Sequence, residues 1–140
     1  MILESTFLLT YISQLRKGNV LCDPKWEIPV TTKFQARIII YELGEFGALV
    51  KGEQVMLYFY SIKVEGSIAK FVQTIDPKKG NAPIRKGPKV LTSGDFADVI
   101  IKLKERQCVE LYKNFGRMGR VVIRKGHFTI AAGTVSELLE

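Results

Sequence analysis

The sequence is poor in the side chains that enzymes use for acid–base or nucleophilic chemistry. Its 140 residues include a single histidine, His127, which stands beside Gly126 in a predicted hairpin turn. A lone histidine in a turn is typical of a surface residue rather than a general base. No Ser/His/Asp or Cys/His arrangement can be assembled from the chain. Asp95 and Asp98 are interpreted as turn and solubility residues, so we expect no catalytic residue and no enzyme activity.

Cysteine is also scarce. Cys22 and Cys108 are far apart in the sequence and no CxxC spacing occurs. This argues against both a zinc site and a disulfide framework. The pattern is typical of a reduced intracellular protein with two packed thiols. We therefore predict a cytoplasmic protein with no metal ligands.

The chain lacks the phosphate loop GxxxxGK[ST], whose backbone amides and lysine hold nucleotide phosphates. The segment from Gly80 to Lys86 has the wrong spacing, contains Pro83, and is not followed by Ser or Thr. We expect no GTP or Mg²⁺ site in this chain. An apolar run at residues 7–12 is too short to span a bilayer and has no basic segment before it, so it predicts a strand rather than a signal peptide.

The composition and periodicity predict an all-β domain. A chain that is 46% hydrophobic and 25% charged has the balance of one ordinary globular domain. Short strand-like runs, separated by turn signals, recur without a convincing helical period. Only residues 111–115 could form a helical turn. The strand-like runs favour a closed antiparallel barrel or sandwich. They cover residues 33–43, 55–60 with a tail at 61–64, 68–75, 89–92, 96–103, 108–111, 120–124 and 128–135.

The stretch from residue 110 to 135 carries the clearest strand pattern. A period of two puts Arg120, Val122 and Arg124 on one face and Val121 with Ile123 on the other. The two arginines would then lie about 13 Å apart on the outer surface. In the next run, the missing side chain of Gly133 suits a bulge or a barrel corner.

This stretch also resembles a known family. The pattern Gly119-Arg120-x-x-x-Arg124, followed by Thr129-Ile130-Ala131-Ala132-Gly133-x-Val135, is similar to the end of the C-terminal barrel of translational GTPases of the elongation factor Tu and one-alpha superfamily. The resemblance extends back through residues 87–95, 33–40 and 15–21, in the family's order, and covers about four-fifths of the chain. It implies a closed six-stranded antiparallel Greek-key β-barrel with a short N-terminal extension.

The resemblance also implies a domain boundary. Residues 15–21 are similar to the closing segment of the family's middle barrel, although Gln14 replaces a usually acidic residue. Residues 23–29 hold two prolines and form a plausible connector. We therefore expect residues 1–28 to be the end of a preceding barrel domain and its linker, and residues 29–140 to be the C-terminal barrel. The chain would then be a fragment of a longer protein, or a gene product that has lost its front end, and GTP with Mg²⁺ would be bound only by the missing domain.

The branch of the superfamily suggests a partner. Residues 110–115, the arginine pair and residues 129–137 look most like the ribosome-rescue GTPase that delivers Pelota, with eukaryotic release factor three close behind. In those branches the strand with the Gly-Arg-x-x-x-Arg pattern binds a tRNA-shaped protein, Pelota or release factor one, which the GTPase delivers to the ribosome. Lys125 stands where elongation factor one-alpha usually has an acid. The resemblance assigns the partner-binding role to Gly119, Arg120, Val122 and Arg124. The alternative for the arginines is that they lie over the barrel wall and pair with local acids such as Glu110.

A second candidate surface is a basic loop. Residues 76–89 hold five basic residues against one acidic residue, a net charge of +4 out of a total of +7. Prolines and glycines predict that the segment is exposed. It could contact phosphate or RNA, or its lysines could only increase solubility. The basic loop leaves a freestanding basic nucleic-acid-binding barrel as one alternative function. The resemblance leaves an elongation factor one-alpha-like barrel that binds aminoacyl-tRNA as another. The candidate phosphate contacts are Lys78, Lys79, Arg85, Lys86 and Lys89.

Overall fold

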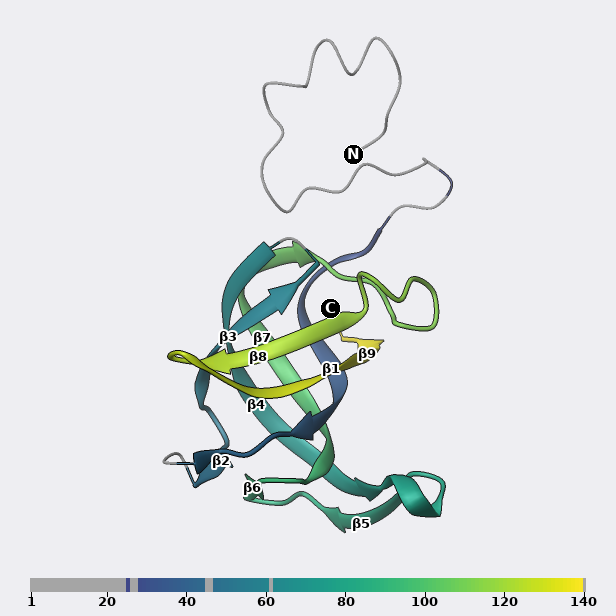
Figure 1. Cartoon of the computed structure of the whole chain (residues 1–140). Coiled ribbons are helices and arrows are strands. Elements are labelled where there is room, and N and C mark those ends of the chain that lie inside the picture. The colour runs from purple at the N-terminus through teal and green to yellow at the C-terminus, as the bar shows by residue number, and fades with distance from the viewer. Residues whose placement is uncertain (1–24, 26–27, 45–46, 61, 140) are drawn as a thin grey trace, which may run out of the picture.

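The structure is a computed structural model that describes Lys25 and residues 28–44, 47–60 and 62–139. Nearly all of the predicted N-terminal segment, residues 1–28, lies outside the described residues, as does Cys22. The described part contains nine strands and one short 3₁₀ helix, η3 (Figure 1). Their bounds are β1 Val30–Ile40, β2 Ala48–Val50, β3 Gln54–Phe59, β4 Ile62–Asp76, η3 Pro77–Lys79, β5 Ala82–Lys86, β6 Val90–Thr92, β7 Phe96–Cys108, β8 Arg120–Lys125 and β9 Phe128–Leu138.

Six of the strands close into an antiparallel barrel. The sheet order is β3-β8-β9-β1-β7-β4-β5, and an additional pairing of β3 with β4 joins the two sides. Because β1 lies between β7 and β9, strands far apart in the sequence become neighbours, as in a Greek key. β5 adds to the end of β4, and β2 pairs with β6 in a separate two-stranded sheet. The predicted six-stranded closed barrel is confirmed.

The inward residues of the strands make one core. On β1, alternate residues from Phe34 to Ile40 are almost fully buried, as the period of two predicts. The ring of Phe34 meets the ring of Phe59 of β3 edge-on, with centroids 5.6 Å apart and planes at 70°. This is a favoured geometry for an aromatic pair. The core therefore ties β1 to β3 across the barrel, although these two strands do not pair.

Two strand boundaries differ from the prediction. Ile62 to Val64 do not extend the strand before them but begin β4, which turns back and pairs with β3 from Phe59↔Ile62 to Gln54↔Ser67. The reversal occurs at Tyr60, whose φ is 26°. A period-two pattern cannot reveal such a tight turn, because both strands of the hairpin have the same alternation. The predicted short strand at residues 108–111 is also absent, since β7 runs on to Cys108 and an irregular segment follows.

β9 has one bulge at Ile130, in its pairing with β8, and another at Ser136, in its pairing with β1, and neither lies at Gly133. The pairing with β8 passes from Ile123↔Ala131 to Arg124↔Thr129, so Ile130 is the extra residue. Ile130 and Ala131 are consequently both buried. Gly133 has a different role, because a Cβ there would lie 2.1 Å from the carbonyl oxygen of Arg37. Glycine at this position allows β9 to approach β1 closely.

Candidate partner-binding surface

The outer face of β8 carries the predicted arginine pair. Arg120 is exposed, Val122 and Arg124 are half-buried on the outside, and Val121 and Ile123 are buried in the core. The predicted inside and outside assignment of this strand is confirmed. Val122 pairs with Tyr58 of β3 on one side and Ala132 of β9 on the other, so the arginines flank the middle of a three-stranded wall.

Arg120 is held over an aromatic ring. Its guanidinium carbon lies 5.6 Å from the centre of the Tyr112 ring, within the range of a cation–π contact. Tyr112 belongs to the irregular segment between β7 and β8, and its amide donates to the carbonyl oxygen of Val135 at 3.1 Å. The Tyr112 side chain is 42% exposed, so both partners remain accessible.

Gly119 sets the distance between this segment and β8. A Cβ at Gly119 would lie 2.4 Å from both the backbone nitrogen and the Cα of Tyr112, closer than real Cβ contacts allow. The Gly119 amide donates to the carbonyl of Phe115, and its carbonyl accepts from the Val135 amide at 2.7 Å. The residue therefore sits at the junction of the 110–119 segment with β9. Its position beside Tyr112 places that ring under Arg120.

Arg124 is held by two contacts of its own. Its guanidinium carbon lies 5.7 Å from the centre of the Tyr58 ring, and one terminal nitrogen, Nη2, donates to the carbonyl oxygen of His127 at 2.8 Å. The buried Nε has no hydrogen-bond partner among the described residues. Arg124 therefore braces the β8–β9 hairpin as well as facing outward, and His127 contributes a backbone carbonyl there.

The nearby acids do not neutralise these arginines. Glu110, the candidate local partner, accepts hydrogen bonds from the Leu111 amide and from the Asn114 side chain instead. Lys125 makes an ion pair with Glu53, so the charge reversal noted in the sequence is compensated within the barrel. Within the described part of the chain, none of the three ion pairs involves Arg120 or Arg124.

Two tyrosines of this surface are absent from the predicted site. Tyr58 and Tyr112 approach the arginines from strand β3 and from the irregular segment, respectively. The alternation of residues 55–60 places Tyr58 outside but does not say which strand lies beside it. The position of Tyr112 depends on the path of residues 110–119, for which the sequence offers no period. Neither tyrosine could have been assigned without the tertiary arrangement.

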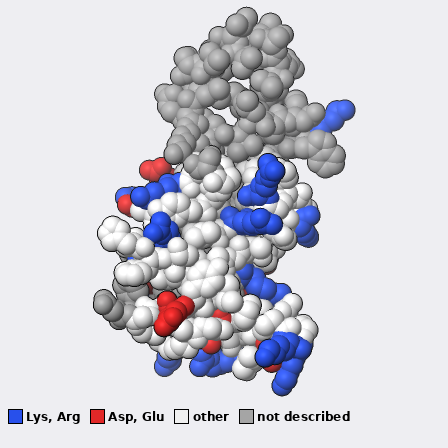
Figure 2. Space-filling view, in the orientation of Figure 1, with Lys and Arg blue, Asp and Glu red and all other residues white. Residues whose placement is uncertain are grey.

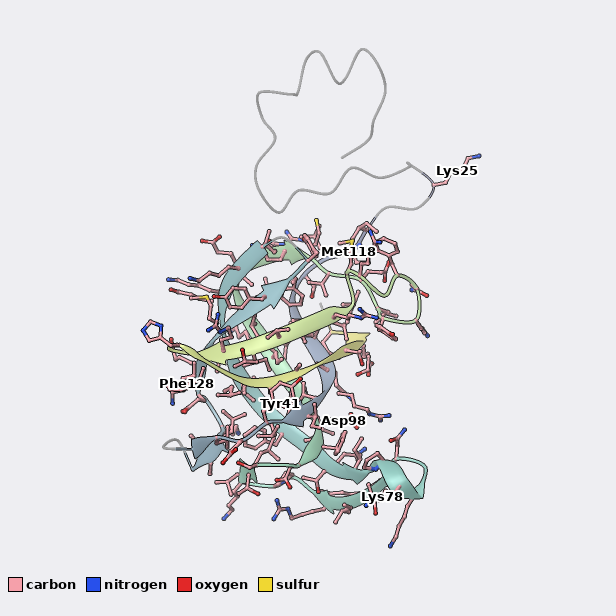
Figure 3. The ribbon with its side chains drawn as sticks, viewed as in Figure 1. Lys25, Tyr41, Lys78, Asp98, Met118 and Phe128 are labelled. Atoms are coloured by element: carbon pink, nitrogen blue, oxygen red, sulfur yellow. The ribbon has the colours of Figure 1, made fainter. Side chains whose placement is uncertain are left out.

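The predicted basic loop is a hairpin rather than an irregular loop. β5 pairs with the end of β4, and η3 forms the turn, where the Asp76 carboxylate accepts from the Lys78 amide at 2.9 Å. Every residue of β5 is exposed. Figure 2 shows Lys and Arg side chains at the end of the barrel where β5 lies, and others at the opposite end. Figure 3 places Lys78 there and Met118 at the opposite end, so the basic hairpin and the 110–119 segment are far apart.

The Asp98 carboxylate has a structural role that the sequence interpretation missed. Asp98 is only 2% exposed and accepts from Arg37 Nε at 2.9 Å and from Gln73 Nε2 at 3.0 Å. It is not a turn residue but the centre of a network that links β1, β7 and β4. The hydrogen bond with Asp98 raises the pKa of the Arg37 guanidinium above its ordinary value. Asp95 does act in a turn, because its carboxylate accepts from the Thr92 amide at 2.9 Å.

The described residues offer neither a metal-binding cluster nor a membrane-spanning helix. No group of three or more His, Cys, Asp or Glu side chains there could hold a metal ion. None of the helical segments in the same part of the chain is long and apolar enough to cross a membrane. The β8 face carries two arginine–tyrosine pairs, Arg120 with Tyr112 and Arg124 with Tyr58.

The family model and the similar proteins all point to one family. The model of the family described as GTP-eEF1A C-terminal domain-like matches residues 33–136. The chain is 32% identical over 127 residues to Protein HBS1 of Drosophila melanogaster. This alignment covers 91% of the chain but only 18% of Protein HBS1. The chain is 30% identical over 125 residues to the eukaryotic peptide chain release factor GTP-binding subunit of Candida maltosa, covering 89% of this chain and 17% of that protein.

A solved structure supports the same grouping. The structure of sup35 complexed with GDP superposes with a TM-score of 0.81 at 28% identity, over 91% of this chain and 30% of that one. The chain thus spans less than a third of the length of these relatives. The match to the family model begins within β1 and ends within β9, and it includes the whole of β8. The chain belongs to the GTP-eEF1A C-terminal domain-like family, the C-terminal barrel of translational GTPases.

Proposed function

We propose that this chain is the partner-binding barrel of a translational GTPase of the release-factor or ribosome-rescue type. In this proposal the outer face of β8 docks a tRNA-shaped protein factor, Pelota or release factor one, for delivery to the ribosome in the cytoplasm. The observation that carries the proposal is the pair of guanidiniums of Arg120 and Arg124, each beside a tyrosine ring and neither paired with a carboxylate among the described residues.

The geometry suits recognition of another protein. Arginine and tyrosine are the residues most enriched at the energetic centres of protein interfaces. A guanidinium already held over a ring loses less conformational freedom on binding than a free side chain. Val122 offers apolar contact between the two arginines, and Phe115, 49% exposed, extends the surface beyond Tyr112. Gly119 takes part by fixing the position of Tyr112 rather than by direct contact.

The catalytic step lies elsewhere in this proposal. We infer that GTP and Mg²⁺ are bound by another part of a longer protein, as the short coverage of the relatives suggests. The barrel would then contribute binding energy and orientation rather than chemistry. No active site is assigned to this chain.

The test is titration calorimetry of the chain against Pelota and against release factor one. Arg120→Glu is the cleanest variant, because Arg120 is exposed and its side chain donates no hydrogen bond to the backbone of the described residues. We expect it to cost at least about 2 kcal/mol of affinity for the true partner, as a hot-spot arginine would. Arg124→Glu should cost a similar affinity together with about 1 kcal/mol of stability, since the bond to His127 is lost.

Arg106→Glu is the matched control. Arg106 is an exposed residue of β7, a strand that pairs with β1 and β4 rather than with β8, and the change reverses the same charge. It should leave affinity within a factor of about two to three. Equal affinity of wild-type and Arg120→Glu proteins for both factors would refute docking by this face. Loss of aminoacyl-tRNA binding in Arg120→Glu, with both protein factors unaffected, would instead assign the barrel to the elongation branch named in the family description.

A further inference from the structure

Three lysines converge on one groove at the side of the basic hairpin. Lys51, Lys70 and Lys89 line a depression of about 260 Å³, together with Phe71, Gly87 and Pro88. All three lysines are exposed, whereas Phe71 and Pro88 are buried and form an apolar floor. The lysines come from three different segments: the turn after β2, the middle of β4, and the segment that leads into β6.

The backbone holds the two walls of the groove in place. On one side, the Gly52 amide donates to the carbonyl of Ile68 at 2.7 Å, which anchors the Lys51 turn to β4. On the other side, the Gly87 amide donates to the carbonyl of Val72 at 2.9 Å. Lys70 lies midway between these two anchor points on β4. The three cations are therefore attached to one rigid strand rather than to free loops.

The arrangement is electrostatically unfavourable without a ligand. Val50 pairs with Val90 at the end of the β2–β6 ladder, and Lys51 and Lys89 are the next residues outward on these two strands. Like charges facing each other at the end of a ladder repel. None of the ion pairs in the described part of the chain involves Lys51, Lys70 or Lys89. An anion in the groove would remove this repulsion.

The positive surface continues from the groove into the hairpin. Gly87 follows β5 directly, and the four other cations of the hairpin, all exposed, carry the charge away from the groove. These four cations are Lys78, Lys79, Arg85 and Lys86. Asp76 is the acid of the hairpin, and it is engaged in capping η3. The groove and the hairpin together hold seven exposed cations, and Figure 3 places Lys78 of the hairpin at the end of the barrel opposite Met118.

We propose that this surface, centred on the groove of Lys51, Lys70 and Lys89, binds the phosphate backbone of RNA. Lysine acts as a point charge and suits sequence-independent contact with successive phosphates. Aromatic stacking is not available in the groove, because Phe71 is buried, so the ligand is a double-stranded stem rather than unpaired bases. None of the residues that line the groove belongs to β8 or to the 110–119 segment, so the proposal does not depend on which protein factor docks on the β8 face.

The experiment measures fluorescence anisotropy of a labelled RNA hairpin stem titrated with the whole chain at several salt concentrations. The variant K51Q/K70Q/K89Q should bind at least about tenfold more weakly, and the slope of log affinity against log salt should fall by about two to three, as the loss of three phosphate contacts requires. The matched control K104Q/R106Q/K113Q removes the same charge from exposed positions elsewhere and should change affinity by less than about threefold.

Three results would overturn the proposal. Equal weakening by the two triple variants would show a general charge effect rather than a site. Competition by polyglutamate as effective as that by unlabelled RNA would assign the surface to acidic protein segments. Binding of the wild-type chain that does not change with salt would exclude phosphate contacts. Docking of a protein factor on the β8 face is tested separately by titration calorimetry, so failure of the groove proposal would leave that one standing.

Discussion

Gly119 and Tyr112 lie so close together that a single added carbon would separate them. A Cβ on Gly119 would stand 2.4 Å from the backbone nitrogen and Cα of Tyr112, and these are backbone atoms that cannot rotate away. The contact matters for function because Tyr112 supports the Arg120 guanidinium. The one glycine thus couples the packing of the 110–119 segment to the shape of the proposed docking surface.

Gly119→Ala should therefore destabilise the barrel by about 2 kcal/mol through overpacking. Gly116→Ala is the matched control, because a Cβ there would meet only the Tyr112 ring, at 3.3 Å. That ring can move by a few tenths of an ångström, so the cost should stay below about 0.5 kcal/mol. Chemical denaturation followed by circular dichroism measures both. Equal stability of the two variants would contradict the close approach.

The bulge at Ile130 gives a second prediction. Ile130→Asp should unfold the barrel, since the carboxylate would enter the core without a partner. Thr129→Asp, one residue away and exposed, should change the stability by less than about 0.5 kcal/mol. Ile123→Asp should behave like Ile130→Asp, because Ile123 is fully buried. A folded Ile130→Asp protein, seen as an unchanged thermal transition, would show that the inward assignment of β9 is wrong.

The Arg37–Asp98 pair should be strongly coupled. Arg37→Met leaves the buried Asp98 carboxylate with one side-chain donor, Gln73. The change should lower the free energy of unfolding by about 2 kcal/mol. The loss is smaller than for a fully buried pair because the Arg37 side chain is 42% exposed. The double variant Arg37→Met/Asp98→Leu should be more stable than the sum of the single changes predicts, by about 1 kcal/mol or more. Chemical denaturation of the wild type, the two single variants and the double variant measures this coupling. If the two single losses of stability simply add in the double variant, the pair contributes nothing beyond its separate residues.

Tyr60 predicts a loss of stability at high pH. Burial, with a smaller contribution from Cys108, raises the pKa of the Tyr60 phenol to about 12 from its ordinary value of 10.0, and its hydroxyl donates to the Cys108 carbonyl at 3.1 Å. Between these two values the unfolded chain has lost the Tyr60 proton while the folded chain keeps it, so the free energy of unfolding falls as pH rises. The stabilisation is complete below pH 10 and lost as pH approaches 12.

Tyr60→Phe lacks this ionisation and serves as the reference. The free energy of unfolding of the wild type should fall relative to Tyr60→Phe across that pH window, although other groups titrate in both proteins. Denaturant titrations at several pH values measure the difference. A constant difference from neutral pH to pH 12 would mean that the Tyr60 pKa is the same in the folded and unfolded chains.

Much of the fold was predictable because barrel strands have a local signature. The alternation of β1 and β8 follows from the period of the strand and needs no knowledge of neighbours, so Ile123 was placed opposite the outward arginines from sequence and is buried. The turn at Tyr60 and the hairpin of β5 were missed for a related reason. A reversal between two alternating segments, or a strand whose residues are all exposed, leaves no break or period in the pattern.

The sequence by itself determined the strand alternation, the outward placement of Arg120 and Arg124, the excess of positive charge between residues 76 and 89, and the family resemblance. Only the tertiary structure decided which side chains those residues meet. Tyr58 and Tyr112 approach the arginines, Arg37 and Gln73 surround Asp98, and Lys51 and Lys70 join Lys89 in one groove. Each of these groups joins residues far apart in the chain, and such contacts depend on barrel closure and register, which no local pattern specifies.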